Sequence, residues 1–168
     1  MTPEPANDYG ITKLACEQLA RLYADRLPII TVRPFNYTGR GQSEAFLIPK
    51  IIAHARARAP VIELGNTEVA RDFSDVRGVV DAYARLLDAP EAVGGVFNIC
   101  SGTARTLAEV IAEVEAASGH HMEVRVNPAF VRADEVKTLC GSAARLESVI
   151  GPLAMPPFGE TIRWMLNA

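Results

Sequence analysis

The chain has 168 residues, of which 49% are hydrophobic and 22% charged, and its formal net charge is -3. This length and composition are typical of one folded domain with a substantial core, and they exclude a disordered chain. The net negative charge and the lack of a Lys/Arg cluster argue against a nucleic-acid surface. No apolar run approaches membrane-spanning length, so we expect no membrane partner.

The cysteines and the start of the chain indicate the compartment. Cys16, Cys100 and Cys140 are odd in number and far apart, and the three histidines have no ligand spacing relative to them. The first residues lack the basic and then apolar pattern of an export signal. We therefore expect reduced thiols in a cytoplasmic protein, and no metal site.

The first elements predicted along the chain are a helix, a strand and a loop. Asn7 or Asp8 can cap a helix whose apolar residues recur at every third or fourth position, and Pro28 ends it. Residues 29–33 (IITVR) predict a strand buried on both faces. A loop of glycine and polar residues follows at 36–42.

Helices and strands continue to alternate after this loop. Thr106 and Glu109 form a capping box, and Gly119 stands where a left-handed residue ends a helix. The pattern predicts an α/β fold with mainly parallel strands. The expected helices are about 49–59, 75–87, 106–118, 143–150 and 160–166, and the expected strands are 61–64, 96–100 and 122–126.

A doubly wound sheet that opens with a helix lacks the strand that should precede that helix. No G-x-G-x-x-G turn occurs anywhere in the chain. The expected fold class is therefore the later part of a Rossmann-like doubly wound sheet, without its glycine-loop half.

Tyr9 and Lys13 are four residues apart, which places both side chains on one face of a helix. A phenol has a pKa of about 10, and a nearby ammonium favours its ionised form by Coulomb attraction. The pair is therefore a candidate proton donor with its charge partner, although a shared surface would give the same spacing.

Several motifs occur in a fixed order: YGITK, RPFNYTGRGQ, RDFSDV, VFNICSG and RADEV. Together they resemble the extended short-chain dehydrogenase/reductases that act on nucleotide sugars. The similarity is greatest to the GDP-6-deoxy-4-keto-mannose reductases, followed by the GDP-mannose 4,6-dehydratases. The resemblance covers the whole chain, but only the second half of such an enzyme.

The resemblance implies two parts. Residues 1–48 would carry the catalytic helix, a strand and the RPFN loop of the Rossmann-like domain. Residues 49–168 would be mainly a small substrate-binding α/β subdomain, with the strand at 96–100 returning to the main sheet.

The resemblance also implies roles for individual residues. Tyr9 and Lys13 would be catalytic and would contact the cofactor NAD(P)(H), as would Pro34 and Phe35. The nucleotide-diphosphate sugar would be bound by Asn36, Lys50, Arg71, Arg132 and Glu135. Ala133 and the segment Gly141 to Ala144 depart from the reductase pattern, which has proline and Gly-Asp-Asn-Ser there.

The implied reaction is reduction of the 4-keto group of a GDP-6-deoxy-hexose. Dehydration of GDP-mannose stays open as an alternative, because the same Tyr/Lys pair serves both reactions. C4 epimerisation of a nucleotide sugar is a third alternative. A further alternative is a non-catalytic remnant that keeps substrate-binding and dimerisation surfaces. Family dimers pack through the tyrosine helix, so we expect a homodimer. We also expect the 168 residues alone to hold the cofactor weakly and to be inactive.

Overall fold

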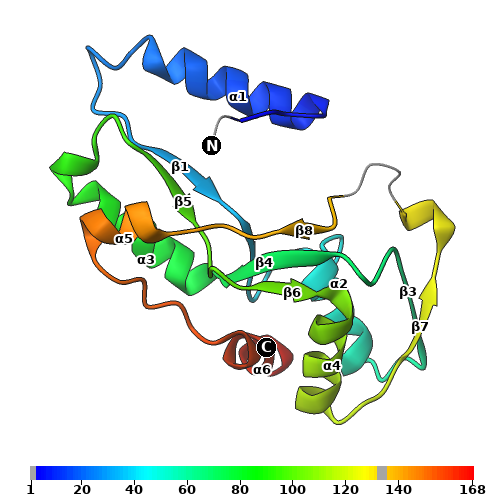
Figure 1. Cartoon of the computed structure of the whole chain (residues 1–168). Coiled ribbons are helices and arrows are strands. Elements are labelled where there is room, and N and C mark those ends of the chain that lie inside the picture. The colour runs from blue at the N-terminus through cyan, green and yellow to red at the C-terminus, as the bar shows by residue number, and fades with distance from the viewer. Residues whose placement is uncertain (1–2, 132–135) are drawn as a thin grey trace.

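The structure is a computed structural model that describes residues 3–131 and 136–168. Figure 1 shows its helices and strands in order. The helices are α1 (Asp8–Arg21), α2 (Leu47–Arg56), α3 (Val76–Leu87), α4 (Leu107–Ser118), α5 (Ala144–Ile150) and α6 (Phe158–Leu166). The strands are β1 (Thr31–Pro34), β2 (Asn36–Thr38), β3 (Val61–Leu64), β4 (Ala70–Asp75), β5 (Val96–Ile99), β6 (Ala104–Thr106), β7 (Glu123–Val126) and β8 (Thr138–Leu139).

In the described part of the chain the strands form three small sheets, and most of their pairs are parallel. β1 pairs with β5, and β3 pairs with β7, both in parallel. In the remaining sheet β4 is parallel to β2 and to β8 but antiparallel to β6. The predicted α/β class with mainly parallel strands is therefore confirmed, and β6 is the antiparallel exception.

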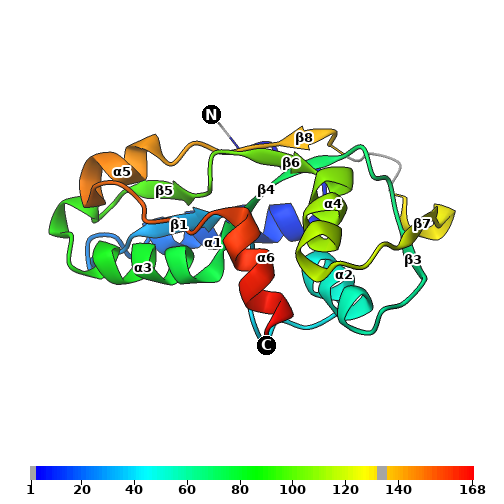
Figure 2. The ribbon, with the colours of Figure 1, turned by 90° about the horizontal axis from the view of Figure 1, so that it is seen from below.

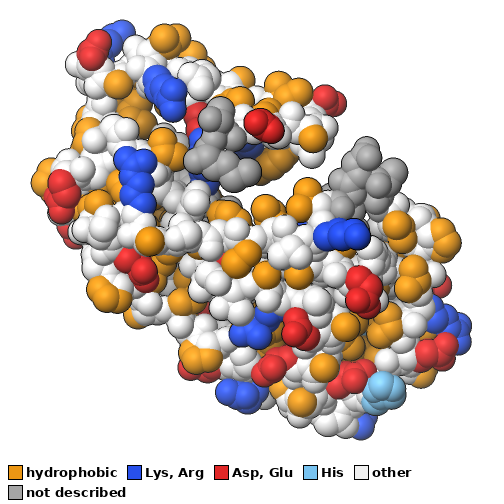
Figure 3. Space-filling view, viewed as in Figure 1, with side chains coloured by type: hydrophobic (Ala, Val, Ile, Leu, Met, Phe, Trp, Pro, Cys, Tyr) orange, Lys and Arg blue, Asp and Glu red, His pale blue; other side chains and the backbone are white. Residues whose placement is uncertain are grey.

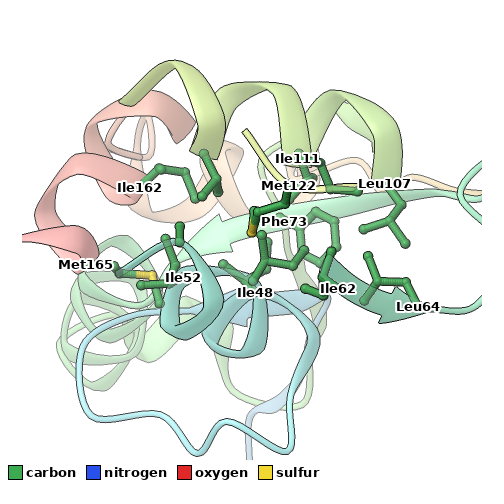
Figure 4. Packing of buried hydrophobic residues seen from close by; sticks show 14 of the residues in the cluster. Ile48, Ile52, Ile62, Leu64, Phe73, Leu107, Ile111, Met122, Ile162 and Met165 are labelled. Atoms are coloured by element: carbon green, nitrogen blue, oxygen red, sulfur yellow. The ribbon is translucent and has the colours of Figure 1, made fainter. Parts of the chain in front are cut away.

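Two apolar cores hold these sheets. One packs Val79, Phe97, Ile99 and Leu146 between β5, α3 and α5. The other joins α2, α4 and α6 to β3 and β4, and Figure 4 shows its side chains converging. Phe73 lies in this second core, where its ring stacks on that of Phe158 with centroids 6.1 Å apart.

Helix α6 lies between the two groups of elements in Figure 2. Thr161 on α6 donates its hydroxyl to Asp75, which is buried and caps α3, at 2.6 Å. Arg77 also donates to the Asp75 carboxylate. Burial raises the pKa of that carboxyl, but the hydrogen bonds from Arg77 and Thr161 outweigh burial, and the pKa is lowered overall. A charged, buried carboxylate thus connects α3 to α6.

The local signals for helix ends are confirmed. Asn7 caps α1 by accepting from the backbone of Gly10, and Thr106 and Glu109 form both hydrogen bonds of the capping box of α4. Gly119 ends α4 in the left-handed region, with φ of 62°. Each signal lies within one turn of the helix end that it stabilises.

Other expectations were wrong. The first helix ends at Arg21, well before Pro28, and its hydrogen bonds then change to tighter turns. Asn36 begins a strand instead of a loop, and β1 is half-buried instead of buried on both faces. The strands β4, β6 and β8 were not predicted at all, because each depends on a distant partner.

Candidate functional site

Tyr9 lies in the first turn of α1, and the residue is 73% exposed. The Lys13 ammonium nitrogen lies 5.4 Å from the centroid of the Tyr9 ring, which is the distance of a cation–π contact. The four-residue spacing therefore does bring the two side chains together on one helical face.

One ion pair connects this helix to the strand that follows it. Arg33 on β1 donates to both carboxylate oxygens of Glu17, at 2.7 and 2.6 Å. These hydrogen bonds lower the pKa of Glu17 and raise that of Arg33. This fork-shaped contact joins α1 to β1 through two parallel hydrogen bonds.

The RPFN segment lies at the carboxyl end of the β1–β5 pair. Pro34 is the last residue of β1, and Phe35 donates its backbone N–H to the carbonyl of Ile99 on β5 at 2.9 Å. Ligands of open parallel sheets bind at this end of the strands. Pro34 and Phe35 lie at this end of the strands, and their contact with a cofactor stays a prediction.

Gly141 lies against the Phe35 ring, where there is no room for a side chain. A Cβ on Gly141 would lie 2.7 Å from both the Phe35 ring and the Cys100 sulfur. The next residues, Ser142 to Ala144, line a hollow of about 310 Å³ together with Ser101 and Gly102. The segment that departs from the reductase pattern thus borders a small cavity beside the RPFN segment.

Among the predicted substrate residues, Asn36 and Arg71 lie near each other in the sheet around β4. Asn36 pairs with Phe73, two residues beyond Arg71. The Arg71 guanidinium donates to the carbonyls of Val136, at 2.7 Å, and Ala70. Arg132 and Glu135, which were also predicted to bind substrate, lie outside the described residues.

Lys50 lies on α2, in a different group of elements from Tyr9. Its ammonium donates to the carbonyl of Glu63 at 2.7 Å and lies 4.9 Å from the centroid of the Phe130 ring. Neither of these contacts is with α1 or with the RPFN segment.

Asp72 is a residue near this site that the sequence analysis missed. Its carboxylate is fully buried and accepts from the Ser101 backbone at 2.8 Å, the Ser101 hydroxyl at 2.6 Å and the Gly102 backbone at 3.0 Å. The backbone of Gly141 also donates to it, at 3.3 Å. Asp72 thereby joins β4 to two segments that flank the cavity. The sequence offered little signal for this role, because β4 is mostly polar and charged, with only Ala70 and Phe73 apolar.

The three cysteines are free thiols. Cys100 is buried; burial and the neighbouring Asp72 carboxylate raise its pKa to about 11.

Within residues 3–131 and 136–168, no group of three or more His, Cys, Asp or Glu side chains is arranged to hold a metal ion. No helix in this part of the chain is long and apolar enough to cross a membrane.

A parallel α/β fold with a Tyr-x-x-x-Lys helix before an RPFN strand defines a Rossmann-like short-chain dehydrogenase/reductase. The chain belongs to the NAD dependent epimerase/dehydratase family, whose model matches residues 1–100.

Named relatives agree with this assignment. The chain is 33% identical over 151 residues to GDP-6-deoxy-D-talose 4-dehydrogenase of Aggregatibacter actinomycetemcomitans, covering 90% of this chain and 51% of the relative. It is 35% identical over 158 residues to GDP-6-deoxy-D-mannose reductase of Pseudomonas aeruginosa, covering 90% and 52%. The chain therefore spans about half the length of the curated relatives it matches.

A solved structure supports the fold over the whole chain. RMD from Pseudomonas aeruginosa, complexed with NADPH, has a TM-score of 0.90 at 31% identity, covering 99% of this chain and 57% of that one. Family members of this fold bind nicotinamide cofactors.

Proposed function

We propose that this chain is the later portion of a nicotinamide-dependent enzyme that reduces the 4-keto group of a GDP-6-deoxy-hexose. The observation that carries the proposal is the Lys13 ammonium 5.4 Å from the Tyr9 ring, on the helix that precedes the RPFN strand. The two relatives named for GDP-6-deoxy sugars support the choice of substrate class.

The proposed chemistry is a proton transfer at the sugar C4. The Tyr9 hydroxyl donates its proton to the carbonyl oxygen, and Lys13 stabilises the phenolate that remains. When bound, the nicotinamide supplies the hydride for the carbonyl carbon. Two contacts support this proposal: Glu17 joins the helix that carries the pair to β1, and β1 ends at Pro34, which Phe35 follows.

The substrate is proposed to lie along the sheet around β4. Arginine suits diphosphate oxygens because its planar fork offers several donors. In the proposed division, residues 1–48 belong to the cofactor-binding part and 49–168 mainly to the substrate-binding part. Asn36, Lys50, Arg71, Arg132 and Glu135 are the proposed substrate residues.

Complementation between separate halves tests this function. The chain is mixed with the separately produced glycine-loop half of the Pseudomonas aeruginosa reductase, and loss of NADPH absorbance is followed with the GDP-4-keto-6-deoxy sugar. We expect turnover that Tyr9→Phe abolishes. A complex that forms but reacts equally well with Phe at position 9 contradicts the proposal. Release of water from GDP-mannose would favour the dehydratase alternative, and exchange at C4 the epimerase.

A non-catalytic module is the second candidate, and the 73% exposure of Tyr9 in this chain favours it. A binding module would retain GDP-sugar binding and form a dimer through α1, but would hold NADPH weakly. Cofactor fluorescence during titration separates the two, since micromolar NADPH binding by the chain alone would contradict this candidate. Light scattering tests the homodimer, which a monomer would exclude.

A further inference from the structure

The helix that carries Tyr9 and Lys13 has few apolar contacts. None of its residues is buried, and Ile11, Leu19 and Leu22 are 54%, 56% and 76% exposed. Figure 1 shows α1 apart from the remaining ribbon, and Figure 3 shows the surface hollowed below it. Apolar burial within this chain by itself therefore contributes little to the position of α1.

The Glu17–Arg33 contact supplies what burial does not. Across residues 3–131 and 136–168, its two hydrogen bonds are the only ones between α1 and another helix or strand. The Glu17 and Arg33 side chains are 17% and 33% exposed, so water competes only partly for them. A two-point bond between a carboxylate and a guanidinium restrains orientation as well as distance.

A small change in orientation at the Glu17–Arg33 contact would displace Tyr9, because Glu17 and Tyr9 lie toward opposite ends of α1. Glu17 follows Tyr9 by two helical turns, which is about 12 Å along the helix axis. A rotation of about 10° at Glu17 therefore displaces Tyr9 by about 2 Å. Reacting groups tolerate less than this, because a misplacement of about 1 Å can slow a reaction about a hundredfold.

We propose that Glu17 and Arg33 are positioning residues, whose ion pair fixes the Tyr9 helix against the carboxyl end of β1. Arg33 immediately precedes Pro34, so the pair joins the two main motifs at a single point. The inference rests on the proposed role of Tyr9. The position of the helix can nevertheless be measured without nucleotide or turnover, so either idea can fail while the other stands.

The native cysteines allow this measurement. Cys16 lies on α1 and Cys140 follows β8; both are exposed, whereas Cys100 is buried. Spin labels on Cys16 and Cys140 report the distance between α1 and the rest of the chain by pulsed electron paramagnetic resonance. The unsubstituted chain is expected to give a narrow distance distribution. Glu17→Gln is expected to broaden it about twofold, because the charged two-point bond is lost.

Further variants separate positioning from stability. Exchanging the charges, Glu17→Arg with Arg33→Glu, is expected to restore the narrow distribution. The matched control is Glu123→Gln, because Arg125 bonds to both Glu123 oxygens, at 2.8 and 3.2 Å, on β7. It is expected to leave the distribution unchanged.

The outcomes decide the proposal. If the contact only stabilises the fold, its loss would lower the free energy of unfolding without altering the distance in the folded state. An unchanged width in folded Glu17→Gln therefore overturns the proposal. If that variant does not fold, the distance distribution of Arg33→Lys is measured instead. Lysine keeps the positive charge but cannot make the two parallel hydrogen bonds of the guanidinium. Broadening then supports positioning, and an unchanged width overturns it.

Discussion

The Asp72 carboxylate accepts both the backbone N–H and the hydroxyl of Ser101, at 2.8 and 2.6 Å. With its further bonds to Gly102 and Gly141, this one buried side chain connects β4 to the loop after β5 and to the segment before α5. The position of the cavity walls beside Phe35 therefore depends on a residue outside the proposed catalytic pair.

Asp72→Asn is expected to lower the free energy of unfolding by about 3 kcal/mol, because the amide nitrogen of Asn would face a backbone donor in a buried site. Urea unfolding followed by circular dichroism measures the change. Ser101→Ala is the control, since it removes only one donor and should cost about 1 kcal/mol. If the two substitutions lowered the free energy of unfolding equally, the Asp72 carboxylate would not be the group on which these connections depend.

The Glu17–Arg33 pair predicts a pH dependence of stability. The pKa of Glu17 is lowered in the folded chain by its bonds to Arg33, so the pair stabilises the fold above the ordinary glutamate pKa of about 4.3. This contribution is lost as the pH falls through the lowered folded value. Partial exposure of the pair limits it to about 1 kcal/mol.

Denaturant unfolding of the unsubstituted chain and Glu17→Gln at several pH values checks this dependence. The two free energies of unfolding should differ at neutral pH and converge in acid, where Glu17 is protonated in both folded and unfolded chains. A difference that persists unchanged at the lowest pH would assign the effect to packing instead of charge.

The thiols are expected to differ in reactivity. Cys16 and Cys140 are exposed, whereas burial and Asp72 raise the pKa of Cys100 to about 11. Because the thiolate is the reactive form, a maleimide near neutral pH should modify Cys16 and Cys140 but not Cys100. Mass spectrometry of the labelled chain counts the modifications, and unfolding in urea should release the last thiol. Rapid labelling of Cys100 in the folded chain would be inconsistent with its burial.

Tyr9 and Lys13 are expected to affect different kinetic constants in the complemented enzyme. Tyr9→Phe should lower kcat by a factor on the order of 100 to 1,000, because the proton donor is lost while the ring remains. Lys13→Met should also raise the KM for NADPH, since its ammonium is expected to contact the nicotinamide ribose. Steady-state kinetics separates the two. A Tyr9→Phe effect on KM alone would argue for binding instead of proton transfer.

Apart from the α/β class itself, the features predicted correctly from the sequence are local ones. The cap at Asn7, the capping box of Thr106 and Glu109, and the shared face of Tyr9 and Lys13 all involve residues within four positions of each other. Backbone geometry fixes such neighbours as soon as a helix forms. The strand at 61–64 was likewise predicted with its bounds, because its apolar alternation is local.

The features that only the tertiary structure decided join distant residues. β4 exists because β2, β6 and β8 pair with it, and Asp72 is buried because donors 29 and 69 positions away close over its carboxylate. Glu17 and Arg33 are 16 positions apart, so they form their hydrogen bonds only when the chain brings β1 next to α1. The sequence by itself therefore determined which side chains share a helical face. The tertiary structure decided which distant segments contact that helix, because bringing distant segments together depends on the whole chain and not on a local pattern.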